Sequence, residues 1–177
     1  FSDFKNFTGH SEQMTAKDLV ANINICFEAF DNIMQKYNIE KIKTIGDAYM
    51  AAGGLPIHSD DSVKRTVLAA LEMQAFISEL GKEKQSKGEH TFEMRVGIHT
   101  GSVVAGIVGV KKFQYDIWGD TVNTASRMES HGEIGKVNIS QNTYNYIKDE
   151  PEFAFEYRGK IEAKGKGEVE MYFVNLK

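Results

Sequence analysis

The sequence predicts an α+β domain with a ferredoxin-like βαββαβ core, in which two helices cover one face of an antiparallel sheet. The order of the expected elements carries this prediction: a strand at 1–4, a helix at 15–37, a hairpin at 39–54, a helix at 62–80 and a β-rich run at 92–99. Later strands and helices add a C-terminal α/β extension. We expect residues 1–177 to form a single domain, because a chain of this length can bury a full core. Its abrupt start within a strand favours a module excised from a longer multidomain protein.

Two helices follow from apolar residues that recur at helical spacing. In the first helix, Thr15 and Asp18 resemble a capping box, and the apolar positions are Leu19, Ile23, Phe27, Phe30 and Tyr37. In the second helix, Asp60 or Asp61 can cap the start, and the apolar positions are Val63, Val67, Leu71 and Ala75. We expect polar loops at 5–14, before the first helix, and at 81–90, after the second.

The hairpin at 39–54 is centred on the pair Gly46-Asp47, which lies between two β-capable apolar runs. Its geometry exposes the Asp47 carboxylate at the tip, and Lys43 lies close by on the first strand. A rigid hairpin with an acid and a base near its tip suits a metal and a ligand. Taken alone, the same residues are more typical of a solvated turn.

The second half of the chain predicts further strands and two short helices. Two β-rich runs, 92–99 and 102–108, flank Thr100-Gly101, which indicates a second hairpin. The remaining elements are expected as a strand at 114–118, a helix at 121–129, a strand at 137–139, a helix from Ser140 to about 148, and strands at 153–157 and 171–175.

The composition of the chain limits the kinds of binding partner that we expect. The net charge of −4 gives no electrostatic footprint for nucleic acid, so no nucleic-acid partner is expected. The single cysteine, Cys26, excludes an internal disulfide. We expect no membrane segment in this chain, because no apolar run is long enough to span a bilayer. The prediction is therefore a cytoplasmic domain, lying on the cytoplasmic side if the parent protein is tethered to a membrane.

Two aspartates are expected to meet at the sheet. In the βαββαβ plan the first strand lies beside the hairpin, so Asp3 and Asp47 come together despite their separation in sequence. Magnesium commonly binds one or two carboxylates plus substrate phosphates. The adjoining loop, Phe4-Lys5-Asn6-Phe7-Thr8, runs toward a helix start and could cradle a polyphosphate. Two metal ions on these carboxylates would activate an attacking oxygen and stabilise a leaving pyrophosphate.

A second group of residues suits a nucleotide. Asn123 and Arg127 are four residues apart on a predicted helix and share one face. Arg stabilises charge that develops on a phosphoryl centre, and Asn can orient a sugar oxygen. Lys43 only donates hydrogen bonds and Asp116 only accepts them, so together they match adenine, whose N6 amino group donates and whose N1 accepts. Guanine presents the opposite edge, which a buried pair would reject.

Four segments of the chain together resemble the catalytic domains of class III nucleotidyl cyclases. They are FSDFKNFT at 1–8, KTIGDAYM at 43–50, RVGIHTG at 95–101 and the run at 115–128, in that order along nearly the whole chain. The resemblance implies the class III cyclase fold, and it implies that Asp3 and Asp47 hold two Mg²⁺ or Mn²⁺ ions per active site.

The resemblance also assigns roles in the substrate site. These are base selection by Lys43 and Asp116, ribose positioning by Asn123, transition-state stabilisation by Arg127, and phosphate binding by Lys164. The match at the phosphate lysine is looser than the others, because Lys166 is an equally short reach away.

An adenylyl cyclase, which converts ATP to 3′,5′-cyclic AMP and pyrophosphate, is the activity that follows. The run at 119–130 looks especially like guanylyl cyclases, but those enzymes carry Glu and Cys where this chain has Lys43 and Asp116. In the family, the metal aspartates and the base-reading groups of one site come from two subunits. Because this chain carries both sets, a head-to-tail homodimer is implied, with an upstream sensor or regulatory domain in the parent chain. A guanylyl cyclase and a catalytically silent regulatory domain are the alternatives.

Overall fold

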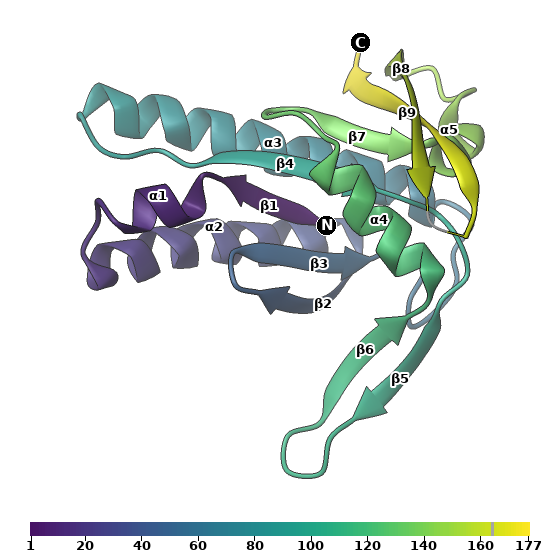
Figure 1. Cartoon of the computed structure of the whole chain (residues 1–177), viewed down its shortest axis with the longest axis horizontal. Helices are drawn as coiled ribbons and strands as arrows, with labels where there is room; N and C mark the ends of the chain where they lie inside the picture. Colours follow the sequence, from purple (N-terminus) through teal and green to yellow (C-terminus); the bar gives the residue numbers. More distant parts are fainter. Residues whose placement is uncertain (164) are drawn as a thin grey trace.

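The computed structural model describes residues 1–163 and 165–177, and it confirms the α+β architecture (Figure 1). The strands are β1 (Ser2–Lys5), β2 (Glu40–Ile45), β3 (Ala48–Ala52), β4 (Glu93–Ile98), β5 (Val104–Val108), β6 (Gln114–Trp118), β7 (Val137–Ser140), β8 (Phe153–Ala163) and β9 (Gly167–Leu176). The helices are α1 (Phe7–Ser11), α2 (Ala16–Tyr37), α3 (Ser62–Ser86), α4 (Asp120–Ser130) and α5 (Gln141–Ile147). One sheet has the order β2-β3-β1-β4-β7-β9-β8, and β5 and β6 form a separate ribbon.

The expected βαββαβ core is formed by β1, α2, β2, β3, α3 and β4. Its four strands lie in the order β2-β3-β1-β4, and each neighbouring pair is antiparallel. β1 therefore lies next to the hairpin, with Ser2 opposite Tyr49 of β3. On its other side β1 pairs with β4, and Asp3 lies opposite Arg95. The extension is joined to this core by a parallel pairing of β4 with β7.

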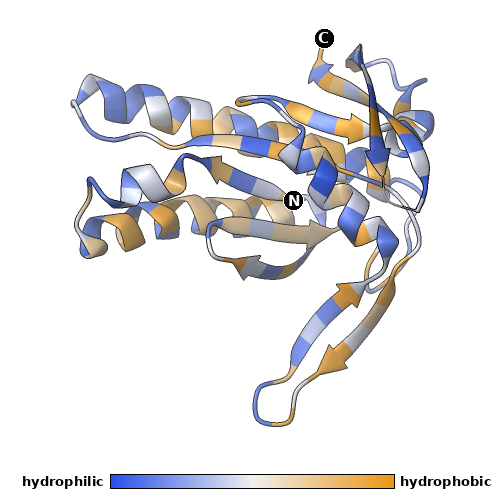
Figure 2. Ribbon diagram, in the orientation of Figure 1, coloured by the Kyte–Doolittle hydropathy of each residue, from blue (hydrophilic) through white to orange (hydrophobic). Residues whose placement is uncertain are grey.

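Helices α2 and α3 cover one face of the sheet, and the main hydrophobic core lies beneath them (Figures 1 and 2). Phe4 of β1 and Met94 of β4 point into this core, where they meet Phe30 and Val67 from the two helices. Burying a side chain of this size contributes about 1.5–3 kcal/mol. Because side chains alternate along a strand, Asp3 and Arg95 are directed to the opposite face of the sheet.

Helix α4 lies on that opposite face and is held close to the sheet. A side chain at Gly97 of β4 would overlap the backbone at Met128 and Glu129, so only glycine permits this approach. The buried Asn138 of β7 donates a hydrogen bond of 2.8 Å from Nδ2 to the backbone oxygen of Met128. The helix that carries Asn123 is thereby fixed against the strand that borders β1.

The expected second hairpin at Thr100-Gly101 is wrong. β4 lies between β1 and β7, and β5 pairs with β6 instead. After Ile98 the chain leaves the sheet and follows the start of α4, where Thr121 Oγ1 donates a hydrogen bond of 2.6 Å to the backbone oxygen of Ser102. Gly101 packs so closely against Thr121 that a larger residue would collide with it. This contact replaces the tight turn.

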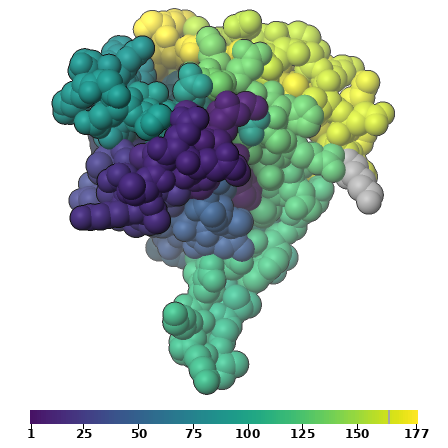
Figure 3. Space-filling model, turned by 60° about the vertical axis from the view of Figure 1, so that its left-hand side comes forward, coloured from purple at the N-terminus to yellow at the C-terminus, as the bar shows by residue number. Residues whose placement is uncertain are grey.

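We call the β5–β6 ribbon, residues 104–118, the arm. Figures 1 and 3 show it projecting away from the body of the domain. Large apolar side chains along it are exposed to solvent, including Val104 (68 %), Ile107 (71 %), Val110 (91 %) and Phe113 (77 %). A lone two-stranded ribbon is at best marginally stable in water. Asp116 and Ile117 are buried at the base of the arm, but the rest of the arm lacks the packing that stabilises the main sheet.

Several boundaries differ from those expected. A short helix, α1, forms inside the expected loop at 5–14, and α3 continues through the expected loop at 81–90 as far as Ser86. Ion pairs one helical turn apart, such as Lys87 with Glu83 at 2.6 Å, support that extension. Strands β8 and β9 pair with each other and are longer than expected. In the part of the chain that the structure describes, no helix combines the length and the apolar character needed to cross a membrane.

The two expected helix caps behave differently. Thr15 caps α2 as expected, because its Oγ1 accepts a hydrogen bond of 3.1 Å from the backbone N–H of Asp18. Asp61 occupies the cap position of α3 but makes no capping hydrogen bond. Its carboxylate instead pairs with Nε of Arg65 at 3.0 Å.

Candidate active site

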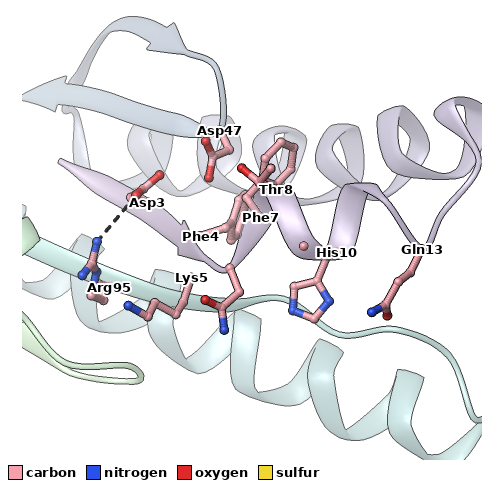
Figure 4. Close-up of a pocket in the computed structure, with 11 residues that line it drawn as sticks. Asp3, Phe4, Lys5, Phe7, Thr8, His10, Gln13, Asp47 and Arg95 are labelled. Atoms are coloured by element: carbon pink, nitrogen blue, oxygen red, sulfur yellow. Dashed lines mark ion pairs between the residues drawn. The ribbon is translucent and has the colours of Figure 1, made fainter.

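Asp3 and Asp47 face each other at the mouth of a pocket of about 650 Å³ (Figure 4). Asp3 comes from β1, and Asp47 comes from the turn between β2 and β3. The pairing of β1 with β3 brings the two together, as the βαββαβ plan predicts. The pocket is lined by Asp3, Phe4, Lys5, Asn6, Phe7, Thr8, Gly9, His10, Gln13, Asp47 and Arg95.

Asp3 and Asp47 carry like charges, which repel each other when both carboxyl groups are ionised. Burial, a hydrogen bond with Asp3 and the charge of Asp3 raise the pKa of the Asp47 carboxyl to about 6. Backbone N–H groups, including that of Phe4, oppose this rise without cancelling it. A divalent cation between the carboxylates would remove the repulsion, so the pair fits a metal ion.

The two carboxylates also suit magnesium or manganese. Both donors are carboxylate oxygens, which hard divalent cations prefer. Among the residues that the structure describes, no third His, Cys, Asp or Glu joins them in a cluster. The remaining coordination positions would be taken by water and by substrate phosphates, as is usual for Mg²⁺.

The expected phosphate loop, residues 4–8, borders the same pocket but is divided in function. Lys5, Asn6 and Thr8 are exposed at the pocket. Phe4 and Phe7 instead turn their rings toward Phe92, with centroid distances of 5.0 and 6.0 Å. The Phe4 side chain is therefore buried in the core, and the Phe7 side chain is half-buried against it.

Lys43 and Asp116 meet on the other side of the hairpin. Nζ of Lys43 donates a hydrogen bond of 2.8 Å to Oδ2 of Asp116, and the backbone N–H of Ile117 donates one of the same length to Oδ1. The hydrogen bond from Lys43, aided by that from Ile117, outweighs burial and lowers the pKa of the Asp116 carboxyl. Asp116 is therefore a buried, ionised acceptor beside a fixed donor.

An apolar wall adjoins this pair. Ile42, Met50 and Ile117 form a small buried cluster between the hairpin and the arm. Met50 and Ile117 also line a second pocket, of about 690 Å³, together with Val122 of α4. Lys43 and Asp116 themselves do not line this second pocket.

Two further predicted residues, Asn123 and Arg127, lie on α4. Asn123 is exposed, and Nη1 of Arg127 donates a hydrogen bond of 3.1 Å to the backbone oxygen of Glu162. Lys166 forms an ion pair of 2.7 Å with Asp120 at the start of the helix. Lys164 lies outside the described residues.

The predicted residues thus form two groups within one chain. The pocket that holds Asp3 and Asp47 is not lined by Lys43, Asp116, Asn123 or Arg127, all of which the structure describes. The structure places Asp3 and Asp47 in one pocket and pairs Lys43 with Asp116, but a single chain does not join the two pairs in one cavity.

Four pocket residues were missed from the sequence: Gly9, His10, Gln13 and Arg95. Arg95 is the most informative, because it forms an ion pair of 3.7 Å with Asp3 (Figure 4). An arginine between the apolar residues Met94 and Val96, on a strand expected to be buried, was the available signal.

Comparison with known proteins gives consistent results at the level of sequence. A family model described as the adenylate and guanylate cyclase catalytic domain matches residues 1–176. The receptor-type guanylate cyclase gcy-28 of Caenorhabditis elegans is 41 % identical over 178 residues, covering 98 % of this chain and 14 % of the relative. An adenylate cyclase of Mycobacterium tuberculosis is 37 % identical over 174 residues, covering 98 % of this chain and 38 % of the relative. The chain therefore spans well under half of either relative.

Solved structures of cyclases are also similar to this chain in fold. The adenylyl cyclase CyaB from P. aeruginosa matches with a TM-score of 0.92 and 31 % identity, covering 99 % of this chain and 91 % of that one. The guanylate cyclase domain of RhGC from Catenaria anguillulae, solved in complex with GTP, matches with a TM-score of 0.88 and 35 % identity, covering 99 % and 93 %. Sequence and fold thus converge: the chain belongs to the family of class III adenylyl and guanylyl cyclase catalytic domains.

Proposed function

We propose that this domain is an adenylyl cyclase, which converts ATP to 3′,5′-cyclic AMP and pyrophosphate. The observation that carries the choice of base is the pair formed by Lys43 and Asp116, 2.8 Å apart and partly withdrawn from solvent. The relatives include both adenylate and guanylate cyclases, so family membership alone does not decide between ATP and GTP.

The pair matches the polar edge of adenine. The Lys43 ammonium has two further N–H donors after its bond to Asp116, and one of them can meet N1 of adenine. Each Asp116 oxygen retains a free lone pair, which can accept from the N6 amino group. Guanine would place O6 against the carboxylate and N1–H against the ammonium. Because buried groups left without a hydrogen bond lower affinity strongly, the site would discriminate against guanine.

Asp3 and Asp47 are the proposed ligands of two Mg²⁺ or Mn²⁺ ions. When bound, such ions would supply positive charge that favours ionisation of the ribose 3′-hydroxyl and neutralises the phosphates. Lys5 and the backbone of residues 4–8 would orient the phosphates at the pocket wall. Asn123 would hold the ribose, and the Arg127 guanidinium would stabilise charge on the α-phosphate in the transition state. Lys164, with Lys166 nearby, is proposed to bind phosphate.

We further propose that each complete site is shared by two chains in a head-to-tail homodimer. The separation of the two residue groups within one chain supports this, because the aspartate pocket lacks the four base-side residues. The arm supports it as well, since its exposed apolar side chains need a cover that the rest of the chain does not provide (Figure 3). A second copy of the chain would bury the arm, and the base-side residues of that copy would complete the pocket.

The proposal extends to the parent protein. The relatives are much longer than the matched segment, which supports a catalytic domain joined to an upstream sensor or regulatory domain. ATP is a cytoplasmic substrate, so we place the domain in the cytoplasm.

A guanylyl cyclase is the second candidate, favoured by the 41 % identity to gcy-28. Incubation of the purified domain with Mn²⁺ and either ATP or GTP separates the candidates. We expect cyclic AMP, with kcat/KM for ATP above that for GTP. A higher kcat/KM for GTP would overturn the base assignment. Loss of both activities in a correctly folded domain would indicate a silent regulatory domain, and an Asp47→Asn variant controls for contaminating cyclases.

A further inference from the structure

Arg95 lies between two carboxylates, one on each side of its guanidinium. Its Nη2 is 2.9 Å from Oε1 of Glu129 and 3.7 Å from Oδ2 of Asp3. Nη1 donates a hydrogen bond of 3.3 Å to the backbone oxygen of Ser130. The nearer anion and the backbone acceptor both belong to the end of α4, so the guanidinium is drawn toward that helix and away from Asp3.

The position of Glu129 is set by the packing of α4 on β4. Gly97 lets the helix backbone approach the strand so closely that a Cβ would overlap Met128 and Glu129. Glu129 is consequently buried, and Arg95 is the only cationic side chain with which it forms an ion pair among the described residues. Nε of Arg95 and Oε1 of Glu129 are both buried without a hydrogen bond in the described structure, so the contact of Nη2 with Oε1 at 2.9 Å is an ion pair. The amino group of Phe1 is a second positive charge that acts on Glu129.

We propose that Glu129 is a positioning residue that holds Arg95 away from Asp3 and so keeps Asp3 available to a divalent cation. The inference rests on the proposed role of Asp3 as a metal ligand. A guanidinium and a metal ion compete for the same carboxylate, because each neutralises its charge. The ion pair with Glu129 keeps Arg95 from neutralising Asp3, so the Asp3 carboxylate stays free to bind the metal ion.

Removing the charge of Glu129 should therefore weaken metal binding through Arg95. In Glu129→Gln the side chain keeps its shape, but Arg95 loses its nearer anion and turns to Asp3. Because a nearby opposite charge changes how strongly a carboxylate binds a cation, we expect Mn²⁺ to bind on the order of 5- to 10-fold more weakly. Glu129→Asp, which keeps the charge on a shorter side chain, should recover part of the loss.

A double-mutant cycle separates this competition from a direct effect of the Glu129 charge. Mn²⁺ binding is measured on the whole domain without nucleotide, by the loss of the electron paramagnetic resonance signal of free Mn²⁺. The four proteins are the wild type, Glu129→Gln, Arg95→Met and the double variant. Glu133→Gln is the matched control, because Glu133 pairs with Arg158 at 3.1 Å just beyond α4 and is not a pocket residue. Thermal unfolding of each variant checks that it is folded.

The proposal expects weaker Mn²⁺ binding in Glu129→Gln, tighter binding in Arg95→Met, and no further effect of Glu129→Gln once Arg95 is absent. Wild-type affinity is expected in Glu133→Gln. An equal loss with and without Arg95 would overturn the proposal in favour of a long-range charge effect. Unchanged binding in Glu129→Gln would overturn it while leaving the metal assignment intact.

Two further outcomes complete the test. Absence of Mn²⁺ binding in the wild type would overturn the metal assignment and the proposal together. If Arg95→Met does not fold, a crystal structure of Glu129→Gln decides the question. The proposal requires Arg95 to have moved within hydrogen-bonding distance of Asp3, and an unmoved Arg95 contradicts it.

Discussion

The two groups of site residues are built on opposite electrostatic principles. Asp3 and Asp47 place like charges together, and burial with mutual repulsion raises the pKa of Asp47 to about 6. Lys43 and Asp116 place opposite charges together, and the pKa of Asp116 is lowered. One member of each group belongs to the same hairpin, Asp47 at its tip and Lys43 on its first strand, whereas Asp3 lies on β1 and Asp116 lies on β6.

The difference indicates what each group requires from its ligand. Nothing within the aspartate pair compensates its two negative charges, so a proton or a cation is needed to remove their repulsion. The Lys43–Asp116 pair is already neutralised and adds only a donor and an acceptor of fixed position. We therefore infer that the first group supplies binding and activation through charge, whereas the second supplies specificity through hydrogen-bond polarity.

The largest expected effect comes from breaking the aspartate pair. Asp47→Ala removes one of the two proposed metal ligands, so turnover with Mg²⁺ should fall by roughly 10³-fold or more. The fold should be retained, because Asp47 lies in a turn outside the main core. The measurement is kcat with saturating ATP and Mg²⁺, alongside a circular dichroism spectrum. Near-normal turnover would remove Asp47 from the metal site.

A smaller effect is expected from reversing the polarity of the second group. The double variant Lys43→Glu with Asp116→Cys exchanges donor and acceptor, so the ratio of kcat/KM for ATP to that for GTP should fall by about 10-fold or more. Each single variant leaves one unmatched group and should lower activity with both nucleotides. An unchanged ratio in the double variant would show that base choice lies elsewhere.

The smallest effect concerns stability without metal. Because the folded-state pKa of Asp47 is raised, its contribution to stability is complete at pH below about 4 and is lost as pH rises through about 6. Asp47→Asn cannot ionise and should therefore be more stable than the wild type at pH 7.5 in EDTA. Since the group is partly exposed, the expected gain in Tm is only about 1–3 °C.

Calorimetry at two pH values provides the control for this prediction. The gain in Tm should vanish at pH 4, where the wild-type carboxyl is protonated, and excess Mn²⁺ at pH 7.5 should favour the wild type instead. A gain of equal size at both pH values would indicate a packing effect rather than relief of charge repulsion.

Much of this arrangement follows from the sequence, for identifiable physical reasons. The proximity of Asp3 and Asp47 follows from the βαββαβ order, because that plan puts β1 beside β3. Thr15 marks the start of α2, because a capping side chain acts locally. Such features depend on neighbours in sequence or on a topology with few alternatives.

The features that the sequence did not reveal depend on contacts between distant segments. The turn expected at Thr100-Gly101 does not form, and Thr121 instead donates a hydrogen bond to Ser102 where the chain follows the start of α4. The ion pair of Arg95 with Glu129 arises only because Gly97 admits the helix to the strand. No local pattern indicates either contact, since each requires α4 to be placed first.

The central claim is that the two groups complete one another across two chains, and mixing inactive variants tests it most directly. Asp47→Ala lacks a metal ligand, and Arg127→Ala should lose on the order of 10²-fold in kcat because transition-state charge is unsupported. In a mixed dimer one site carries both lesions and the other carries none. We predict that activity reappears on mixing and that specific activity falls on dilution. If a tag pull-down confirms subunit exchange and the mixture stays inactive, the shared-site account is contradicted.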